Sequence, residues 1–119
     1  MTDRTSPAAI VQAQLDAYNA HDVEALVAIY ADDVRHYRHP DTLLASGSAQ
    51  LRERFTARFS SARPHATLLN RIVCGDLVID HERIDSDGTG GPGSVELVAS
   101  YEVKQGRIAR AWFHFGPET

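Results

Sequence analysis

The stretch LDAYNAHDVEALVAIYADDV, residues 15–34, holds the end of one helical pattern, a short turn and a complete second pattern. Apolar residues recur at spacings of three and four on both sides of Asp22, which predicts two amphipathic helices. Asp22 is suited to cap the second helix. Because the connection is short, the two helices are expected to fold back on each other.

The first helix is expected within residues 5–22, with Ser6 as its N-cap and Pro7 at its first position. The second is expected over residues 23–33. The residues predicted to point inward from the two helices are Val11, Leu15, Tyr18, Leu26, Val27 and Tyr30.

Residues 34–40, VRHYRHP, are typical of a short strand that Pro40 ends. Residues 41–47 are expected to form a loop, and a third helix is predicted from Ser48 to Arg63. We interpret the arginines of this helix as a solvated face. Its apolar stripe is formed by Leu51, Phe55 and Phe59.

The second half of the chain carries strand patterns at residues 65–73, 77–85, 94–103 and 107–115. A tight connection at residues 74–76 joins the first two as a hairpin, and the glycine-rich residues 85–93 are expected to form a loop. Helices followed by an antiparallel meander indicate an α+β fold. We expect a cone-shaped, curved antiparallel sheet covered by three helices.

The overall composition narrows the classes of protein that fit. At 119 residues, with 43% hydrophobic and 24% charged residues, the chain fits one domain over residues 1–119. Its net charge of −4 argues against a nucleic-acid-binding protein. The single cysteine excludes an intramolecular disulfide. No leader-like start and no membrane-length apolar run is recognised, so a cytoplasmic location is expected.

Three runs of the sequence resemble a known superfamily. They are residues 15–34, SGSAQLRERF at residues 46–55 and YEVKQGRIARAWF at residues 101–113. Together they look like the NTF2-like superfamily, nearest to its SnoaL-like and ketosteroid-isomerase-like branch, and the resemblance extends from Ile10 to Phe115. It implies a cystatin-like α+β roll with a pocket beside the strand after the second helix. It also implies a homodimer through the outer face of the sheet.

The superfamily includes isomerases, polyketide cyclases, dehydratases, epoxide hydrolases and binding proteins without catalysis, so fold does not fix activity. Steroid delta-isomerase chemistry needs a carboxylate base, a tyrosine and a protonated aspartic acid. The resemblance places these positions on Arg38, Gln14 and Ala99. None of the three residues matches, so the resemblance implies a pocket without ketosteroid isomerase activity.

Residues of the 34–40 strand are the first candidates for chemistry. If Val34 faces the core, the two-residue period of a strand places His36 and Arg38 on the pocket side. His36 is then a candidate catalytic base, because the ordinary pKa of histidine is about 6.5, and Arg38 is suited to hold a substrate oxygen. The alternative is that both residues lie on a solvated edge strand.

The run IDHERID, residues 79–85, is the second polar concentration. Asp80 and Glu82 share one face of the predicted strand, and His81 lies on the other. Two carboxylates this close can share a proton, which is one route to a raised pKa, so both are catalytic candidates. The alternative is that they pair with Arg38 and are structural ions. If the register is reversed, His81 faces the pocket instead.

Other residues are expected to line the pocket without taking part in proton transfer. The substrate-binding candidates are Gln14, Tyr18, Tyr30, Arg38, Phe55, Phe59, Tyr101, Phe113 and Phe115. Trp112 and His114 lie on the opposite face of the last strand, which we expect to form the homodimer contact. No pair of histidines has the spacing of metal ligands, so neither a metal nor a cofactor is predicted.

Two functions remain open from the sequence. The first is a cofactor-independent enzyme that performs acid–base chemistry on a small apolar, oxygenated molecule: isomerisation, cyclisation, hydration or dehydration. The second is a non-catalytic ligand-binding module or dimeric interaction module of the same fold. The substrate itself cannot be named from these residues.

Overall fold

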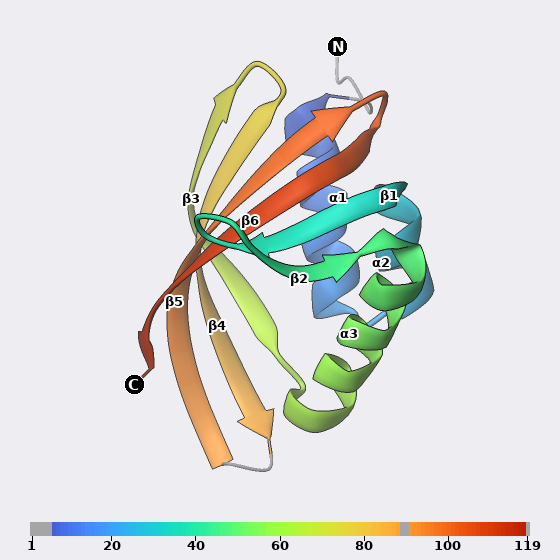
Figure 1. Ribbon diagram of the computed structural model, residues 1–119. Coiled ribbons are helices and arrows are strands. Elements are labelled where there is room, and N and C mark those ends of the chain that lie inside the picture. Colours follow the sequence, from blue (N-terminus) through green and yellow to red (C-terminus); the bar gives the residue numbers. More distant parts are fainter. Residues whose placement is uncertain (1–5, 89–90, 119) are drawn as a thin grey trace.

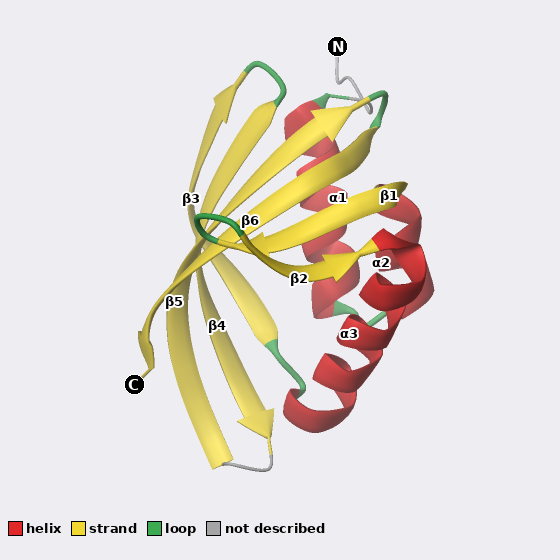
Figure 2. Cartoon of the chain, in the orientation of Figure 1, coloured by secondary structure: helices red, strands yellow, loops and turns green. Residues whose placement is uncertain are grey.

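The computed structural model describes residues 6–88 and 91–118 of the chain. The helices are α1 (Pro7–Asn19), α2 (Val23–Ile29) and α3 (Gly47–Ala62). The strands are β1 (Tyr30–Arg38), β2 (Thr42–Ser46), β3 (His65–Cys74), β4 (Leu77–Gly88), β5 (Gly91–Lys104) and β6 (Arg107–Glu118). Figures 1 and 2 show a strongly bent sheet with the helices on one side.

The six strands form one sheet in the order β2-β1-β6-β5-β4-β3. All neighbouring pairs are antiparallel except β1 and β6, which run parallel. This arrangement confirms the predicted α+β class and the curved, mostly antiparallel sheet. None of the helices within the described ranges is long and apolar enough to cross a membrane.

Both predicted helix caps are confirmed. The Ser6 hydroxyl accepts a hydrogen bond from the Ala9 amide at 3.2 Å, and the Asp22 carboxylate accepts one from the Ala25 amide at 3.1 Å. Each cap satisfies one amide that has no partner within its helix. His21 has a positive φ of 56° in the turn between α1 and α2, which allows the two helices to fold back on each other.

Element boundaries differ from the sequence prediction in four places, one of which is β6, predicted to end at residue 115 and extending to Glu118. The second helix ends at Ile29, and residues 30–33 begin β1 instead of completing the helix. Residues 41–47, expected as a loop, contain β2, which pairs antiparallel with β1. The strands β4 and β5 extend into the expected loop at residues 85–93, whose residues 89 and 90 lie outside the described residues. In each case a neighbouring strand supplies backbone hydrogen bonds, which overrides weak local propensity.

The hydrophobic core lies between the helices and the inner face of the sheet. The predicted helix residues Val11, Leu15, Tyr18, Leu26, Val27 and Tyr30 are all buried, as are Leu51, Phe55 and Phe59 of α3. On the outer face, Trp112 is half-buried and its ring stacks on Tyr37 at 6.0 Å between centroids. His114, on the same face, is exposed.

Candidate functional site

A cavity of about 720 Å³ lies between α1, α3 and the concave face of the sheet. This volume is within the usual range for small-molecule sites. Its inner end carries buried polar groups from three elements: Gln14 of α1, His36 of β1 and Glu82 of β4. Its outer rim carries Arg38 of β1 with Arg54 and Arg58 of α3, which are exposed or half-buried. We call these three arginines the basic rim.

Strand β1 presents the side chains to the cavity that its alternation predicts. Val34 is buried in the core, and His36 and Arg38 both line the cavity. Tyr37 points to the opposite face of the sheet, where it stacks on Trp112. The expectation that His36 and Arg38 lie on the pocket side is therefore confirmed.

The register of β4 places Asp80 and Glu82 inward. Both are buried, together with Val78 and Ile84 of the same face. His81 is on the outer face, where it contacts Glu96 of β5. The reversed register, with His81 in the pocket, is therefore excluded.

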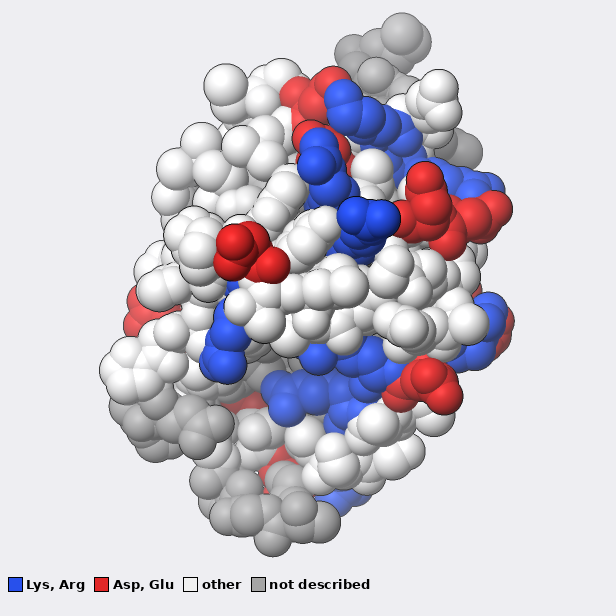
Figure 3. Space-filling view, viewed as in Figure 1, with Lys and Arg blue, Asp and Glu red and all other residues white. Residues whose placement is uncertain are grey.

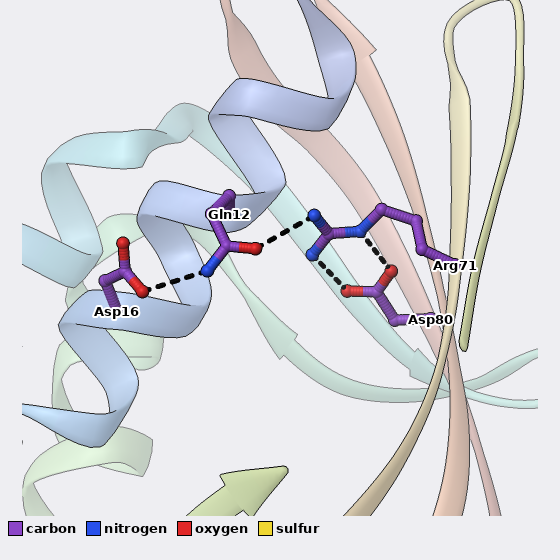
Figure 4. A network of polar contacts seen from close by, with 4 residues as sticks. All are labelled: Gln12, Asp16, Arg71 and Asp80. Atoms are coloured by element: carbon purple, nitrogen blue, oxygen red, sulfur yellow. Dashed lines mark hydrogen bonds and ion pairs between the residues drawn. The ribbon is translucent and has the colours of Figure 1, made fainter. Parts of the chain in front are cut away.

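Asp80 is held in an ion pair and does not line the cavity. The Arg71 guanidinium donates two hydrogen bonds to it, from Nε to Oδ1 at 2.7 Å and from Nη2 to Oδ2 at 2.9 Å. Arg71 Nη1 also donates to Gln12 at 3.0 Å, and the Gln12 amide donates to Asp16 at 3.0 Å (Figure 4). Asp80 thus acts on the cavity only through its charge.

Glu82 lines the cavity and is only 4% exposed. Its Oε2 atom has no hydrogen-bond partner among the described residues. Burial, together with a smaller contribution from the nearby charge of Asp80, raises the pKa of Glu82 to about 7, although the charge of Arg71 opposes both effects. A carboxyl group with this pKa is present in both protonation states near neutral pH, as a general acid or base requires.

His36 lies in an aromatic environment at the inner end of the cavity. Its ring centroid is 4.9 Å from that of Tyr30 and 5.0 Å from that of Phe113. Neither ring nitrogen has a hydrogen-bond partner in the described parts of the chain. Burial, with a smaller contribution from the charge of Arg54, lowers the pKa of His36 to about 3. At neutral pH the imidazole is therefore uncharged and serves as a hydrogen-bonding group.

Most of the predicted substrate-binding residues lie on the cavity wall. Those that line it are Gln14, Tyr18, Arg38, Phe55, Tyr101, Phe113 and Phe115. Tyr30 and Phe59 are buried but do not line it. Burial raises the pKa of Tyr18 and of Tyr101, so both hydroxyls stay protonated near neutral pH. Tyr18 also accepts a hydrogen bond from Arg58 Nε at 3.4 Å.

Arg54 and Arg58 were missed as site residues, because the arginines of α3 were interpreted as a solvated face. That interpretation fits Arg52, which pairs with Glu24 on the surface, but it is wrong for the two cavity residues. The signal was present in the sequence. Arg54 and Arg58 are four residues apart, and each directly flanks a residue of the Phe55–Phe59 stripe, so they border the buried face of the helix.

The positions that the resemblance assigns to steroid isomerisation hold no such chemistry. Gln14 and Arg38 line the cavity, and Ala99 is buried in β5. Within residues 6–88 and 91–118, no three His, Cys, Asp or Glu side chains are grouped closely enough to hold a metal ion. The polar chemistry of the cavity is therefore carried by Glu82, His36, the tyrosines and the basic rim.

Comparisons with known proteins agree with this architecture. The sequence model of the SnoaL-like domain matches residues 11–111. No curated protein matches the sequence. A cystatin-fold protein from Novosphingobium aromaticivorans superposes with a TM-score of 0.84 at 24% identity, covering 91% of this chain and 97% of that one.

Two similar structures come from Mycobacterium tuberculosis. One is an LEH-like epoxide hydrolase, with a TM-score of 0.79 and 16% identity, covering 90% of this chain and 80% of that chain. The other is a protein in complex with estradiol-17β-hemisuccinate, with a TM-score of 0.79 and 21% identity, covering 91% and 92% of the two chains. At these identities the similarities establish the fold alone.

Proposed function

The chain belongs to the SnoaL-like domain family, and we propose that it binds a small apolar, oxygenated molecule and transfers a proton on it. The reaction class is isomerisation, cyclisation, hydration or dehydration without a cofactor. The observation that carries the proposal is Glu82: a buried carboxyl group on the cavity wall, with one oxygen unpartnered among the described residues and its pKa raised to about 7.

In this mechanism the ionised Glu82 accepts a proton from a C–H bond beside a carbonyl group, or from a water molecule that attacks the substrate. When a C–H bond is broken, its electron pair moves toward the carbonyl oxygen of the substrate. When water is deprotonated, the water oxygen uses the freed electron pair to form the new bond to the substrate. Protonated Glu82 then returns the proton to the product. Neutral His36 and the hydroxyl of Tyr101 donate hydrogen bonds to the substrate oxygen, which stabilises charge that develops there.

The proposal assigns different roles to the three residues expected to be catalytic. Glu82 is the proton carrier. His36 is not the catalytic base in this proposal, because its lowered pKa makes it a weak proton acceptor. Asp80 does not line the cavity, and its charge adds to the effect of burial, which is the main cause of the raised pKa of Glu82. The ligand of one M. tuberculosis neighbour and the hydrolase activity named for the other support small-molecule binding in this fold by analogy.

The first test is a thermal-shift screen against steroids, aromatic polyketides, terpenoid epoxides and small carboxylic acids, followed by product analysis for each compound that binds. A ligand at about 100 times its Kd stabilises the protein by about 2.7 kcal/mol. For a compound that is turned over, Glu82→Gln should reduce kcat by about 100-fold or more. Glu96→Gln, on the outer face, is the matched control and should keep full activity.

A non-catalytic binding module predicts different results. Compounds would bind saturably without any product, and Glu82→Gln would bind them as well as the wild type does. That outcome would reject proton transfer and retain the pocket. A screen without any binding compound would reject both functions.

We also propose a homodimer through the outer sheet face. Around Trp112 and His114 this face carries the exposed apolar side chains of Leu43 and Val98, which lie opposite Tyr37 and His114 in neighbouring strands. Sedimentation equilibrium should give a dimer for the wild type and a monomer for Trp112→Arg. A cytoplasmic location stays a prediction, for cell fractionation to test.

A further inference from the structure

The arginines of the basic rim differ in their partners from most other arginines in the described parts of the chain. Six arginines in the described parts of the chain form ion pairs with carboxylates: Arg52, Arg63, Arg71, Arg83, Arg107 and Arg110. Four arginines form none with any described residue: the three of the basic rim and Arg35, which is exposed and does not line the cavity. The protein has a net charge of −4, yet the three positive charges of the basic rim have no carboxylate partner among the described residues.

Arg54 and Arg58 lie one helical turn apart on α3, so their guanidinium groups repel each other. Although much of the Arg54 side chain is exposed, the surrounding protein and the charge of Arg58 lower the pKa of its guanidinium. Arg58 donates a long hydrogen bond, at 3.4 Å, to the Tyr18 hydroxyl on the cavity wall. A pair of like charges held together in this way is stabilised when an anion binds between them.

The carboxyl group inside the cavity does not neutralise this pair. Glu82 forms no ion pair with either arginine of α3, and its pKa responds to Asp80 and Arg71 instead. The charge of Arg54 does reach the inner cavity, because it contributes to the lowered pKa of His36. In Figure 3, Lys and Arg side chains gather over the region where Figure 1 places α3.

The wall between the rim and the inner end is aromatic. Phe55, Phe113 and Phe115 line it, and the rings of Phe113 and Phe115 are stacked at 6.4 Å. The Arg38 guanidinium lies 5.3 Å from the centre of the Phe115 ring, which holds the third rim charge over the apolar wall. The cavity is thus positive at its rim, apolar along its wall and acidic at its inner end.

We propose that the pocket selects amphipathic organic anions: molecules with an apolar, ring-containing body and a single carboxylate, sulfate or phosphate group. The oxyanion binds to the guanidinium groups of Arg54 and Arg58, which are suited to bidentate contacts, and Arg38 adds a third positive charge. The body lies along the aromatic wall, and the opposite end of the molecule reaches Glu82. Only this last contact rests on the proposed function; the preference for an anion does not.

Matched fluorescent probes test the preference for an anion directly. The carboxylate 1-pyrenebutyrate is compared with the neutral 1-pyrenebutanol, and the sulfonate 8-anilinonaphthalene-1-sulfonate with the neutral N-phenyl-1-naphthylamine. The two pairs also distinguish carboxylate from sulfonate recognition. For wild type, each anion should bind about tenfold or more tightly than its neutral counterpart, as expected for hydrogen bonds to charged groups. Added salt should weaken binding of the anions alone.

The variant Arg54→Gln/Arg58→Gln should remove this preference, because it should weaken binding of the anions about tenfold more than binding of the neutral probes. Arg52→Gln is the matched control, because it removes a charge from the same helix outside the cavity. Circular dichroism melts establish that each variant is folded. Glu82→Gln should keep the preference for the anions.

The possible results separate the two proposals. If the anions and the neutral probes bind equally, or if Arg52→Gln has the same effect as the double variant, the anion inference is wrong and the pocket stands. If the double variant weakens the binding of all probes alike, the arginines shape the cavity but do not favour anions over neutral molecules, and the inference is also wrong. If no probe binds the wild type, the proposed pocket function fails together with it.

Discussion

Asp80 and Glu82 are two residues apart on one face of β4, yet they are in opposite chemical situations. Asp80 receives two hydrogen bonds from Arg71 and is fully buried. Glu82 faces the cavity with one oxygen unpartnered among the described residues. One carboxyl group therefore has a counter-charge beside it, whereas burial disfavours the charge of the other. Partners, more than burial, decide which carboxylate is structural and which is available for chemistry.

The largest expected effect comes from breaking the structural half of this pair. Arg71→Ala leaves Asp80 buried without a counter-charge, which should reduce the free energy of unfolding by about 3–5 kcal/mol in urea denaturation. The control is Arg83→Ala, which removes the neighbouring, exposed pair with Asp85 and should cost about 0–1 kcal/mol. Equal losses of unfolding free energy in the two variants would show that the buried Arg71–Asp80 pair contributes no more to stability than the exposed pair.

The second prediction concerns the pH dependence that Glu82 gives to stability. Its pKa is about 7 in the folded protein and about 4.5 when unfolded, so between these values the folded state binds more protons. Stability from Glu82 is therefore full below pH 4.5 and is lost as pH rises to 7, by about 3 kcal/mol. Glu82→Gln should lack this loss. Parallel stability curves for wild type and variant would contradict the raised pKa.

A smaller effect of opposite sign is expected from His36. Its pKa falls from 6.5 to about 3 on folding, so the unfolded state binds more protons and stability is lost as pH falls below 6.5. Between pH 6.5 and 5 the loss should be about 2 kcal/mol. His36→Phe keeps an aromatic ring among Tyr30 and Phe113 and should lack this loss. If the variant shows the same acid sensitivity, His36 is not buried in its neutral form.

The same comparison shows what could be predicted from sequence. The alternation of β4 was enough to place Asp80 and Glu82 on one inward face, and the alternation of β1 placed His36 and Arg38. The alternative that Asp80 pairs with Arg38 is wrong, and its actual partner Arg71 was not predicted, because it comes from another strand. A signal was nevertheless present. The hairpin turn at residues 75–76 pairs Cys74 with Leu77, and counting back along both strands places Arg71 opposite Asp80.

Other features depend on packing that local patterns do not encode. From helical propensity alone, the second helix is predicted to continue to residue 33. In the structure α2 ends at Ile29, because pairing of β1 with β6 begins at Tyr30. Arginines on α3 look alike in the sequence, and only the position of the sheet decides that Arg52 meets Glu24 while Arg54 and Arg58 meet the cavity. The lowered pKa of His36 likewise follows from aromatic rings on three separate elements.

The most direct test of the account is the pKa of Glu82 itself, measured by NMR titration of protein with carbon-13-labelled glutamate carboxyl groups. Comparison with Glu82→Gln assigns the signal. The account predicts one glutamate that titrates near pH 7 in the wild type and is missing in the variant. If the missing signal titrates near 4.5, Glu82 is an ordinary carboxylate, and the proposed proton transfer has no group to perform it.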